Sequence, residues 1–380
     1  MKQVYLDYNA TTPVAPSVQE AIIPILREFY GNPSSTHAMG RACAEAIEDA
    51  RNRVAMLLGA EVEEIIFTSG GTEANNLALK GVMQRHEPSS GAHLIISSFE
   101  HPAITEPTKY LQQLGYQVTV VPCNSHGVVE PEAIESAMTS KTVLVSIMHA
   151  NNEIGTVQPI SRIAEICRAQ NVLIHTDAAQ SIGKIRTVAS ELGVDLLSMA
   201  GHKFYAPKGV GALYVKQGVA IDPVIHGAGH EGGLRPGTEN TPYIVGLGKA
   251  AQLAHQSVTD VGDRMAMLRD RLLQQLREGI GERLTVNGDK AERLPNTLSA
   301  NFPGVDGSTL LGRIPELCAS TGSACHSGTT HLSKTLEAIG LTSDTGRGTV
   351  RLSVGWHTSE EDIDRAASLL LEAWENLHEA

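Results

Sequence analysis

A lysine follows a run of residues that predicts a buried strand. The apolar run at 194–199 predicts the strand, and Lys203 lies in the segment at 200–207 directly after it. A lysine in such a place is costly unless its amine is paired, neutral or covalently used. Its amine could form a covalent link with a carbonyl cofactor. Taken alone, a surface lysine in a Gly/Pro-rich turn is the simpler interpretation. Other residues of the chain are needed to distinguish it from a cofactor-binding lysine.

Glycines and hydroxyls follow a second expected strand, at 64–67. The segment at 68–73 contains Gly71 and Thr72 and precedes a helical run. Backbone N–H groups at such a helix start can bind an anion, and a phosphate held by Gly71 and Thr72 is the functional interpretation. The alternative is a tight turn in which Thr72 caps the helix. The segment matches neither a P-loop nor GxGxxG, so nucleotide binding is not indicated.

Three more polar residues follow expected strands. His101 comes after the run at 95–98, and Asp177 and Gln180 come after the run at 172–175. Asp177 could keep a pyridine nitrogen protonated, and His101 could stack on a cofactor ring and move protons. A helix cap for Asp177 and a structural histidine are the alternatives. Since ligands of open α/β sheets bind beyond the carboxyl ends of the strands, we expect these groups to converge.

The segment at 318–331 is rich in small polar residues, and we expect it to be an exposed, mobile loop. Cys325 lies in it beside His326, which favours a reactive thiolate over the buried, inert thiol that is commoner. A metal site is the rival interpretation, with Cys318, Cys325, His326 and His331 as ligands. The absence of a Cys-x-x-Cys pair argues against zinc.

The elements that must position these residues form an α/β pattern. Strand-like runs alternate with amphipathic helical stretches from about residue 45 to 215, which predicts a mostly parallel sheet covered on both faces. One long helix is expected at 245–280. The remainder, 281–380, predicts two or three strands and a final helix at 359–377. We therefore expect a large domain at 16–260 and a smaller α+β domain made of 1–15 and 261–380.

Composition restricts the class of protein. The chain has 380 residues, 42% of them hydrophobic, and a net charge of −12, which argues against direct nucleic-acid binding. No apolar run is long enough to span a membrane, and the first residues lack the pattern of a signal peptide. Five scattered cysteines are typical of a reducing cytoplasm.

These residues belong to motifs that resemble one family along essentially the whole chain. The motifs are YLDYNATTP at 5–13, GNPSSTH at 31–37, FTSGGTE at 67–73, NNEIG at 151–155, DAAQ at 177–180, GHK at 201–203, RPGTEN at 235–240, TGSAC at 321–325 and VRLSVG at 350–355. They resemble those of the NifS/IscS-type cysteine desulfurases, which are class V aminotransferases. The TGSAC segment resembles that of the first group, which has the longer cysteine loop. The resemblance implies the fold-type I architecture of pyridoxal 5′-phosphate (PLP) enzymes, with a seven-stranded sheet between helices.

The resemblance also implies a role for each residue. Lys203 would carry PLP covalently, with Asp177 at the pyridine nitrogen, Gln180 at the ring hydroxyl and His101 stacked on the ring. The phosphate would be held by Gly71, Thr72 and His202, and by Thr238 from the other subunit of a homodimer. Asn151 and Arg351 would bind the carboxylate of L-cysteine; the planar fork of an arginine suits that role. The Cys325 thiolate would take the sulfur as a persulfide and leave alanine, with acid–base help from His101.

The chain departs from the family in two places. Ala200 replaces a serine that contacts the phosphate, so we expect weaker PLP binding. The chain stops soon after Leu377, whereas some relatives carry a tail that docks a scaffold for iron–sulfur assembly.

Other functions stay open at this point. A selenocysteine lyase, a sulfur carrier that uses Cys325 without PLP, and a metal-binding regulator are the alternatives. The acceptor is expected to be a protein, but iron–sulfur clusters, tRNA thiolation, DNA sulfur modification and cofactor synthesis all fit as destinations of the sulfur.

Overall fold

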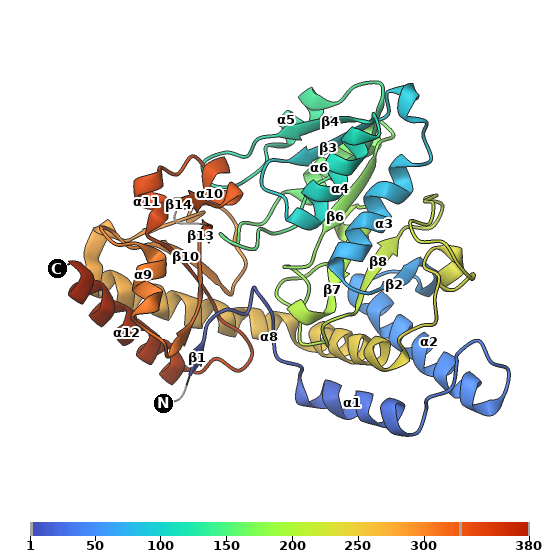
Figure 1. The fold of residues 1–380 in the computed structure, drawn as a ribbon, viewed down its shortest axis with the longest axis horizontal. Coiled ribbons are helices and arrows are strands. Elements are labelled where there is room, and N and C mark those ends of the chain that lie inside the picture. The colour runs from blue at the N-terminus through green and yellow to red at the C-terminus, as the bar shows by residue number, and fades with distance from the viewer. Residues whose placement is uncertain (1–2, 327–328, 379–380) are drawn as a thin grey trace.

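The computed structural model describes residues 3–326 and 329–378, without the side chains of 323–331. It has two lobes (Figure 1). The large lobe is built on a seven-stranded sheet and the small lobe on a four-stranded sheet. Helix α8 (Thr241–Ile280) runs from the large lobe into the small one and is 40 residues long, so it begins before the predicted helix and ends with it.

The seven-stranded sheet has the order β2-β8-β7-β6-β5-β3-β4. Only β8 runs antiparallel to its neighbours, so the prediction of a mostly parallel sheet is confirmed. The strands are β2 (Ile65–Thr68), β3 (His93–Ser97), β4 (Gln117–Val121), β5 (Thr142–Ser146), β6 (Leu173–Asp177), β7 (Leu196–Ala200) and β8 (Gly211–Val215).

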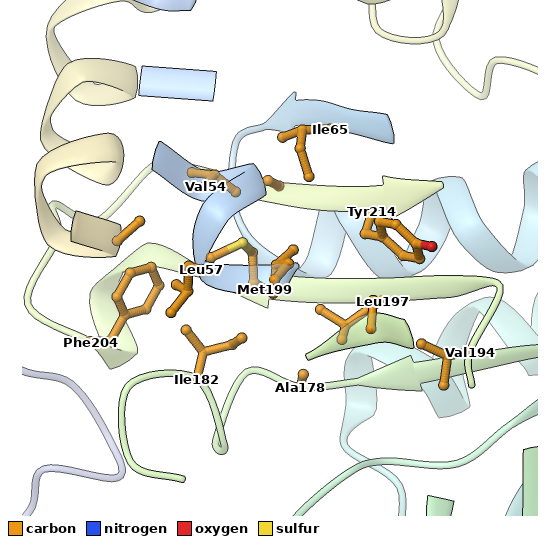
Figure 2. Close-up of a cluster of buried hydrophobic side chains, with 14 of the residues drawn as sticks. Val54, Leu57, Ile65, Ala178, Ile182, Val194, Leu197, Met199, Phe204 and Tyr214 are labelled. Carbon is orange, nitrogen blue, oxygen red and sulfur yellow. The ribbon is translucent and has the colours of Figure 1, made fainter. Parts of the chain in front are cut away.

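Helices cover both faces of this sheet. Its strands are therefore buried on both sides and appear in the sequence as continuous apolar runs. In β7, Leu196 packs on the face covered by α3 (Gly71–Met83) and α4 (Pro102–Gln113). Leu197 and Met199 pack on the other face, where Figure 2 shows them beside side chains of α2 (Ala38–Leu58). The first half of α8 and α6 (Ile160–Ala169) complete that face. The other helices of the large lobe are α1 (Pro16–Arg27), α5 (Pro131–Ala137) and α7 (Ala189–Leu192).

The small lobe has more strands than the sequence predicted. Seven strands lie in the described part of 281–380, where two or three were expected. Three of them have only two residues, too short for any alternating pattern to show. The strands are β9 (Thr285–Val286), β10 (Thr297–Asn301), β11 (Leu317–Cys318), β12 (Ser320–Thr321), β13 (Ser323–His326), β14 (Thr329–Leu332) and β15 (Thr349–Ser353).

A separate hydrophobic core holds the small lobe together. It joins β10 and β15 to the second half of α8 and to α12 (Glu360–His378). The first residues of the chain belong to it, because β1 (Val4–Tyr5) pairs with β11 in parallel. The remaining small-lobe helices are α9 (Gly307–Gly312), α10 (Lys334–Ala338) and α11 (Ser343–Arg347). No helix in the described part of the chain has the length and apolarity needed to cross a membrane.

Candidate active site

A cavity of about 470 Å³ lies at the carboxyl ends of β6 and β7, the edge where ligands of α/β sheets bind. Most of the residues predicted from the sequence line it. They are Gly71, Thr72, His101, Asp177, Gln180, His202, Lys203 and Arg351. The expected convergence at one sheet edge is therefore observed.

Lys203 lies in a short 3-10 turn directly after β7. Its Nζ donates to the backbone carbonyls of Asn9 (2.7 Å) and Ala10 (2.8 Å). Burial, and then the positive charge of Arg351, lower the pKa of Lys203 to about 8. A neutral amine, the nucleophilic form, is thus within reach at neutral pH.

Asp177 is the last residue of β6 and is buried. Its carboxylate accepts from the side-chain amide of Asn75 (2.7 Å) and from the backbone N–H of Ala179 (2.9 Å). It forms no ion pair with any side chain in the described part of the chain. A buried carboxylate held only by neutral donors favours a cationic partner in the cavity.

His101 caps the N-terminus of α4, where its Nδ1 accepts from the backbone N–H of Ala103 (3.1 Å). That bond places the lone pair on Nδ1 and, in the neutral ring, the proton on Nε2. Burial is the main cause of the lowered pKa of His101; the Lys203 charge lowers it too, while Asp177 raises it. The ring is therefore neutral at physiological pH and can pass a proton.

The start of α3 forms one end of the cavity. The helix begins at Gly71, and its N-cap is Gly70, so the alternative of a Thr72 cap is not observed. A Cβ built on Gly71 would lie 3.2 Å from the Cβ of Ala200, at the end of β7. Side chains are small here, so an anion could approach the free N–H groups of the helix. His202 lies nearby with Nδ1 3.1 Å from the Thr11 hydroxyl, and burial lowers its pKa to about 4.

Arg351 reaches the cavity from β15 of the small lobe. It pairs with Asp7 (2.7 Å) and donates to the backbone carbonyl of Asn152 (3.1 Å). Its Nε has no partner among the described residues. The guanidinium therefore keeps donor capacity.

Asn151, which the resemblance placed at the substrate, does not line the cavity. It is fully buried, and its side-chain oxygen accepts from the backbone N–H groups of Glu153 (2.8 Å) and Ile154 (3.0 Å). The next residue, Asn152, lines the cavity instead.

Two other predicted residues are not placed at the cavity. Thr238 is exposed and is not among the cavity-lining residues of this chain. The backbone of Cys325 lies in β13 opposite Thr330, a hairpin where the sequence predicted a loop. Its side chain, and those of His326 and His331, lie outside the described residues.

Sequence reasoning missed Asn9, a fully buried residue of the N-terminal segment. Its backbone carbonyl accepts from Lys203 and from Gln180 Nε2 (3.0 Å). Its side chain donates to Thr297 (2.8 Å) and to the carbonyl of Asn152 (3.1 Å). Asn9 lies in the motif at 5–13, which was the one signal in the sequence that could have identified it. This motif is far in sequence from the other site residues.

Comparisons with known proteins agree with this geometry. The family model "Aminotransferase class-V" matches residues 4–366. The cysteine desulfurase IscS of Clostridium botulinum strain Hall is 45% identical over 373 residues, covering 97% of this chain and 94% of that protein. The structure of a NifS-like protein superposes with a TM-score of 0.91 at 39% identity, over the whole of both chains.

A structure described as SspA in complex with cysteine gives a TM-score of 0.83 at 35% identity, covering 92% of this chain and 98% of that one. The chain belongs to the class V aminotransferase family and, within it, to the cysteine desulfurases of the IscS/NifS type.

Proposed function

We propose that this protein is a PLP-dependent cysteine desulfurase that converts L-cysteine to L-alanine and passes the sulfur, as a Cys325 persulfide, to an acceptor protein. The observation that carries the proposal is the meeting of a lysine with a lowered pKa, a buried carboxylate without a cation and a helix N-terminus in one cavity. In a chain of this family, these are the groups that a phosphorylated pyridine aldehyde requires.

The residues present fit PLP. Asp177 would hold the protonated pyridine nitrogen, and Asn75 would keep the carboxylate oriented toward it. The phosphate would lie at the N-terminus of α3, on Gly71 and Thr72, with the His202 ring beside it. Gln180 would face the ring hydroxyl and His101 the ring itself.

PLP, when bound, supplies a carbonyl that links covalently to amines and a ring that withdraws electrons from the bonds to the substrate Cα. Lys203 would hold the cofactor and, once its amine is free, would take the Cα proton. The carbonyls of Asn9 and Ala10 accept two N–H bonds from that amine. With two hydrogens so placed, the lone pair of the neutral amine is held in a fixed direction.

Arg351 would bind the substrate carboxylate, with Asn152 in place of the neighbouring Asn151. The position of both side chains on the cavity supports this. The lowered pKa of His101 leaves its ring neutral, which suits proton transfer to the substrate.

Cys325 would then act as the nucleophile. Its thiolate attacks the substrate sulfur, an S–S bond forms and the substrate C–S bond breaks. A proton returned to the carbon gives alanine, and the enzyme keeps a persulfide. We place Cys325 near the cavity because β12, directly before its hairpin, pairs with β15 beside Arg351.

We further propose a cytoplasmic homodimer in which Thr238 of one subunit completes the phosphate site of the other. The exposed position of Thr238 supports this. The cysteines whose side chains are described are all unpaired, as expected in a reducing compartment.

The test is peptide mass mapping of the PLP-loaded protein after incubation with L-cysteine. We expect a mass increase of one sulfur atom on the peptide that contains Cys325, and an equal amount of alanine. The Lys203→Ala variant should show neither. Arg162→Ala, a substitution in an exposed pair with Glu165, is the matched control and should behave as the wild type. An unmodified Cys325 with no alanine released would contradict the proposal and favour a sulfur carrier.

A further inference from the structure

A second lysine, Lys184, lies behind the cavity and has no role in the mechanism above. It is 5% exposed and pairs with no carboxylate in the described part of the chain. Its Nζ donates to Gln180 Oε1 (2.8 Å) and to Asn9 Oδ1 (3.4 Å). A buried amine held only by amide oxygens is unusual, because its burial is costly and an apolar side chain would avoid that cost.

The bond to Lys184 determines which way the Gln180 amide faces. The Lys184 amine donates to the oxygen of the amide, which leaves the amide nitrogen on the other side. That nitrogen donates one N–H to the backbone carbonyl of Asn9 (3.0 Å), which can only accept. Both neighbours therefore demand the same orientation. The second N–H of Gln180 remains for the cavity that this residue lines.

The side chain of Asn9 is oriented in the same manner. Its oxygen accepts from Asn296 Nδ2 (2.9 Å) as well as from Lys184, and its nitrogen donates to Thr297 (2.8 Å). Neither amide can flip without placing a donor against a donor. Lys184 thus ends a chain of hydrogen bonds in which every amide has one allowed direction.

We propose that Lys184 is a positioning residue that fixes Gln180 as a hydrogen-bond donor toward the ring oxygen of PLP, and so holds that oxygen as an anion. An N–H aimed at a phenolic oxygen stabilises its deprotonated form, whereas an amide oxygen in that place would require the protonated form. The inference rests on the proposed binding of PLP and adds a residue to which that proposal gives no role.

The surroundings of Lys184 agree with this role. Burial, and then the positive charges of Lys203 and Arg351, lower the pKa of Lys184 well below its usual value. A group that loses its charge so readily contributes little as a counter-ion. Its donor capacity remains in either protonation state, because Asn9 keeps the Gln180 nitrogen turned away from it.

A double-mutant cycle tests the inference. The variants are Lys184→Met, Gln180→Leu and both together, and two properties of each apoprotein are measured on adding PLP. These are the dissociation constant for PLP and the pH midpoint of the absorption change of the bound cofactor. For Lys184→Met we expect about a tenfold weaker PLP binding and a midpoint raised by about half a pH unit or more, as for the loss of one buried hydrogen bond.

Non-additivity is the decisive result. If Lys184 acts through Gln180, the double variant should match Gln180→Leu alone in both properties. Ile182→Ala, a buried substitution close by in sequence, is the matched control and should lower the thermal midpoint without moving the absorption midpoint. Additive effects, or a Lys184→Met variant that titrates like the wild type, would overturn the inference. A wild type that fails to bind PLP would instead overturn the proposed function.

Discussion

Lys203 is partly buried and donates to two backbone carbonyls. Its lowered pKa predicts how covalent attachment of PLP to the apoprotein depends on pH. With a pKa of about 8, roughly one amine in ten is neutral at pH 7. The rate of covalent PLP attachment should therefore rise with pH and level off above about pH 8. We would follow attachment by absorbance between pH 6.5 and 10. Arg351→Met should move the plateau to higher pH, because that charge lowers the pKa. A wild-type rate still rising tenfold per unit near pH 10 would contradict the prediction.

Ala200 stands beside the helix start that we propose as the phosphate site. A serine hydroxyl there would lie within reach of an anion, because the Ala200 Cβ borders the cavity at Gly71. Ala200→Ser should lower the PLP dissociation constant by about tenfold or more, the effect of one hydrogen bond to a charged group. Equilibrium dialysis of the apoprotein measures it, and equal retention by the two proteins would show that the missing serine is of no consequence.

At the residue scale, the sequence predicted groups that follow strands better than groups inside turns. Lys203 and Asp177 were identified because a charged side chain after an apolar run stands out. Asn151 and Asn152 are adjacent and identical in type, so no pattern could say which of them faces the cavity. The choice depends on the turn at 151–155, where the side-chain oxygen of Asn151 accepts hydrogen bonds from backbone N–H groups.

At the scale of elements, a histidine joins three strands of the large sheet. His175 in β6 lies 2.8 Å from the Ser146 hydroxyl of β5 and 3.0 Å from the Ser198 hydroxyl of β7. Burial lowers its pKa to about 3. The folded state therefore binds fewer protons than the unfolded state, where the pKa is about 6.5. Stability from this residue is complete above pH 6.5 and is lost as the pH falls toward 3.

We predict that the thermal midpoint of the wild type falls more steeply between pH 7 and pH 5 than that of His175→Gln. Each pH unit in this range removes about 1 kcal/mol through this one residue. Glu100, whose pKa burial raises to about 8, has the opposite sign and is present in both proteins. The comparison by calorimetry therefore isolates the histidine. If the thermal midpoints of the two proteins fell in parallel with pH, the lowered pKa of His175 would be contradicted.

Helices and strands were predicted correctly where they are long enough to show a clear hydrophobic pattern. Each strand of the large sheet was predicted, because burial on both faces gives a continuous apolar run. The short strands of the small lobe were not predicted, since β11 and β12 have two residues each and are defined by their partners β1 and β15. The β1–β11 pairing joins residues more than 300 positions apart, and the β12–β15 pairing joins only two pairs of residues.

At the scale of the whole molecule, the two hydrophobic cores meet along α8. Its first half packs in the large lobe and its second half in the small lobe. We propose that these are the cores of two domains, with the boundary near residue 260. Of the residues before α1, Val4 and Leu6 pack in the small-lobe core, whereas Tyr8 and Ala15 pack in the large-lobe core. The cavity takes Arg351 from the small lobe and Lys203 from the large one, so its geometry depends on how the lobes are held.

Asn9 is the residue most directly placed to hold the lobes together. Its side chain bonds on the small-lobe side to Thr297 (2.8 Å) and Asn296 (2.9 Å), and on the large-lobe side to the carbonyl of Asn152 (3.1 Å) and to Lys184 (3.4 Å). Replacing it by alanine removes four hydrogen bonds of a buried side chain. We expect Asn9→Ala to cost about 2–4 kcal/mol of stability.

The control for this substitution is Asn287→Ala. Asn287 is as well buried, but its side chain bonds only within the small lobe, to Ser299 and Asn301. It should lower stability while leaving PLP binding unchanged. Asn9→Ala should weaken PLP binding and separate thermal unfolding into two transitions, because the lobes then lose the hydrogen bonds that this side chain makes between them. A single transition at the wild-type temperature, with wild-type PLP binding, would mean that the lobes are coupled without the Asn9 side chain.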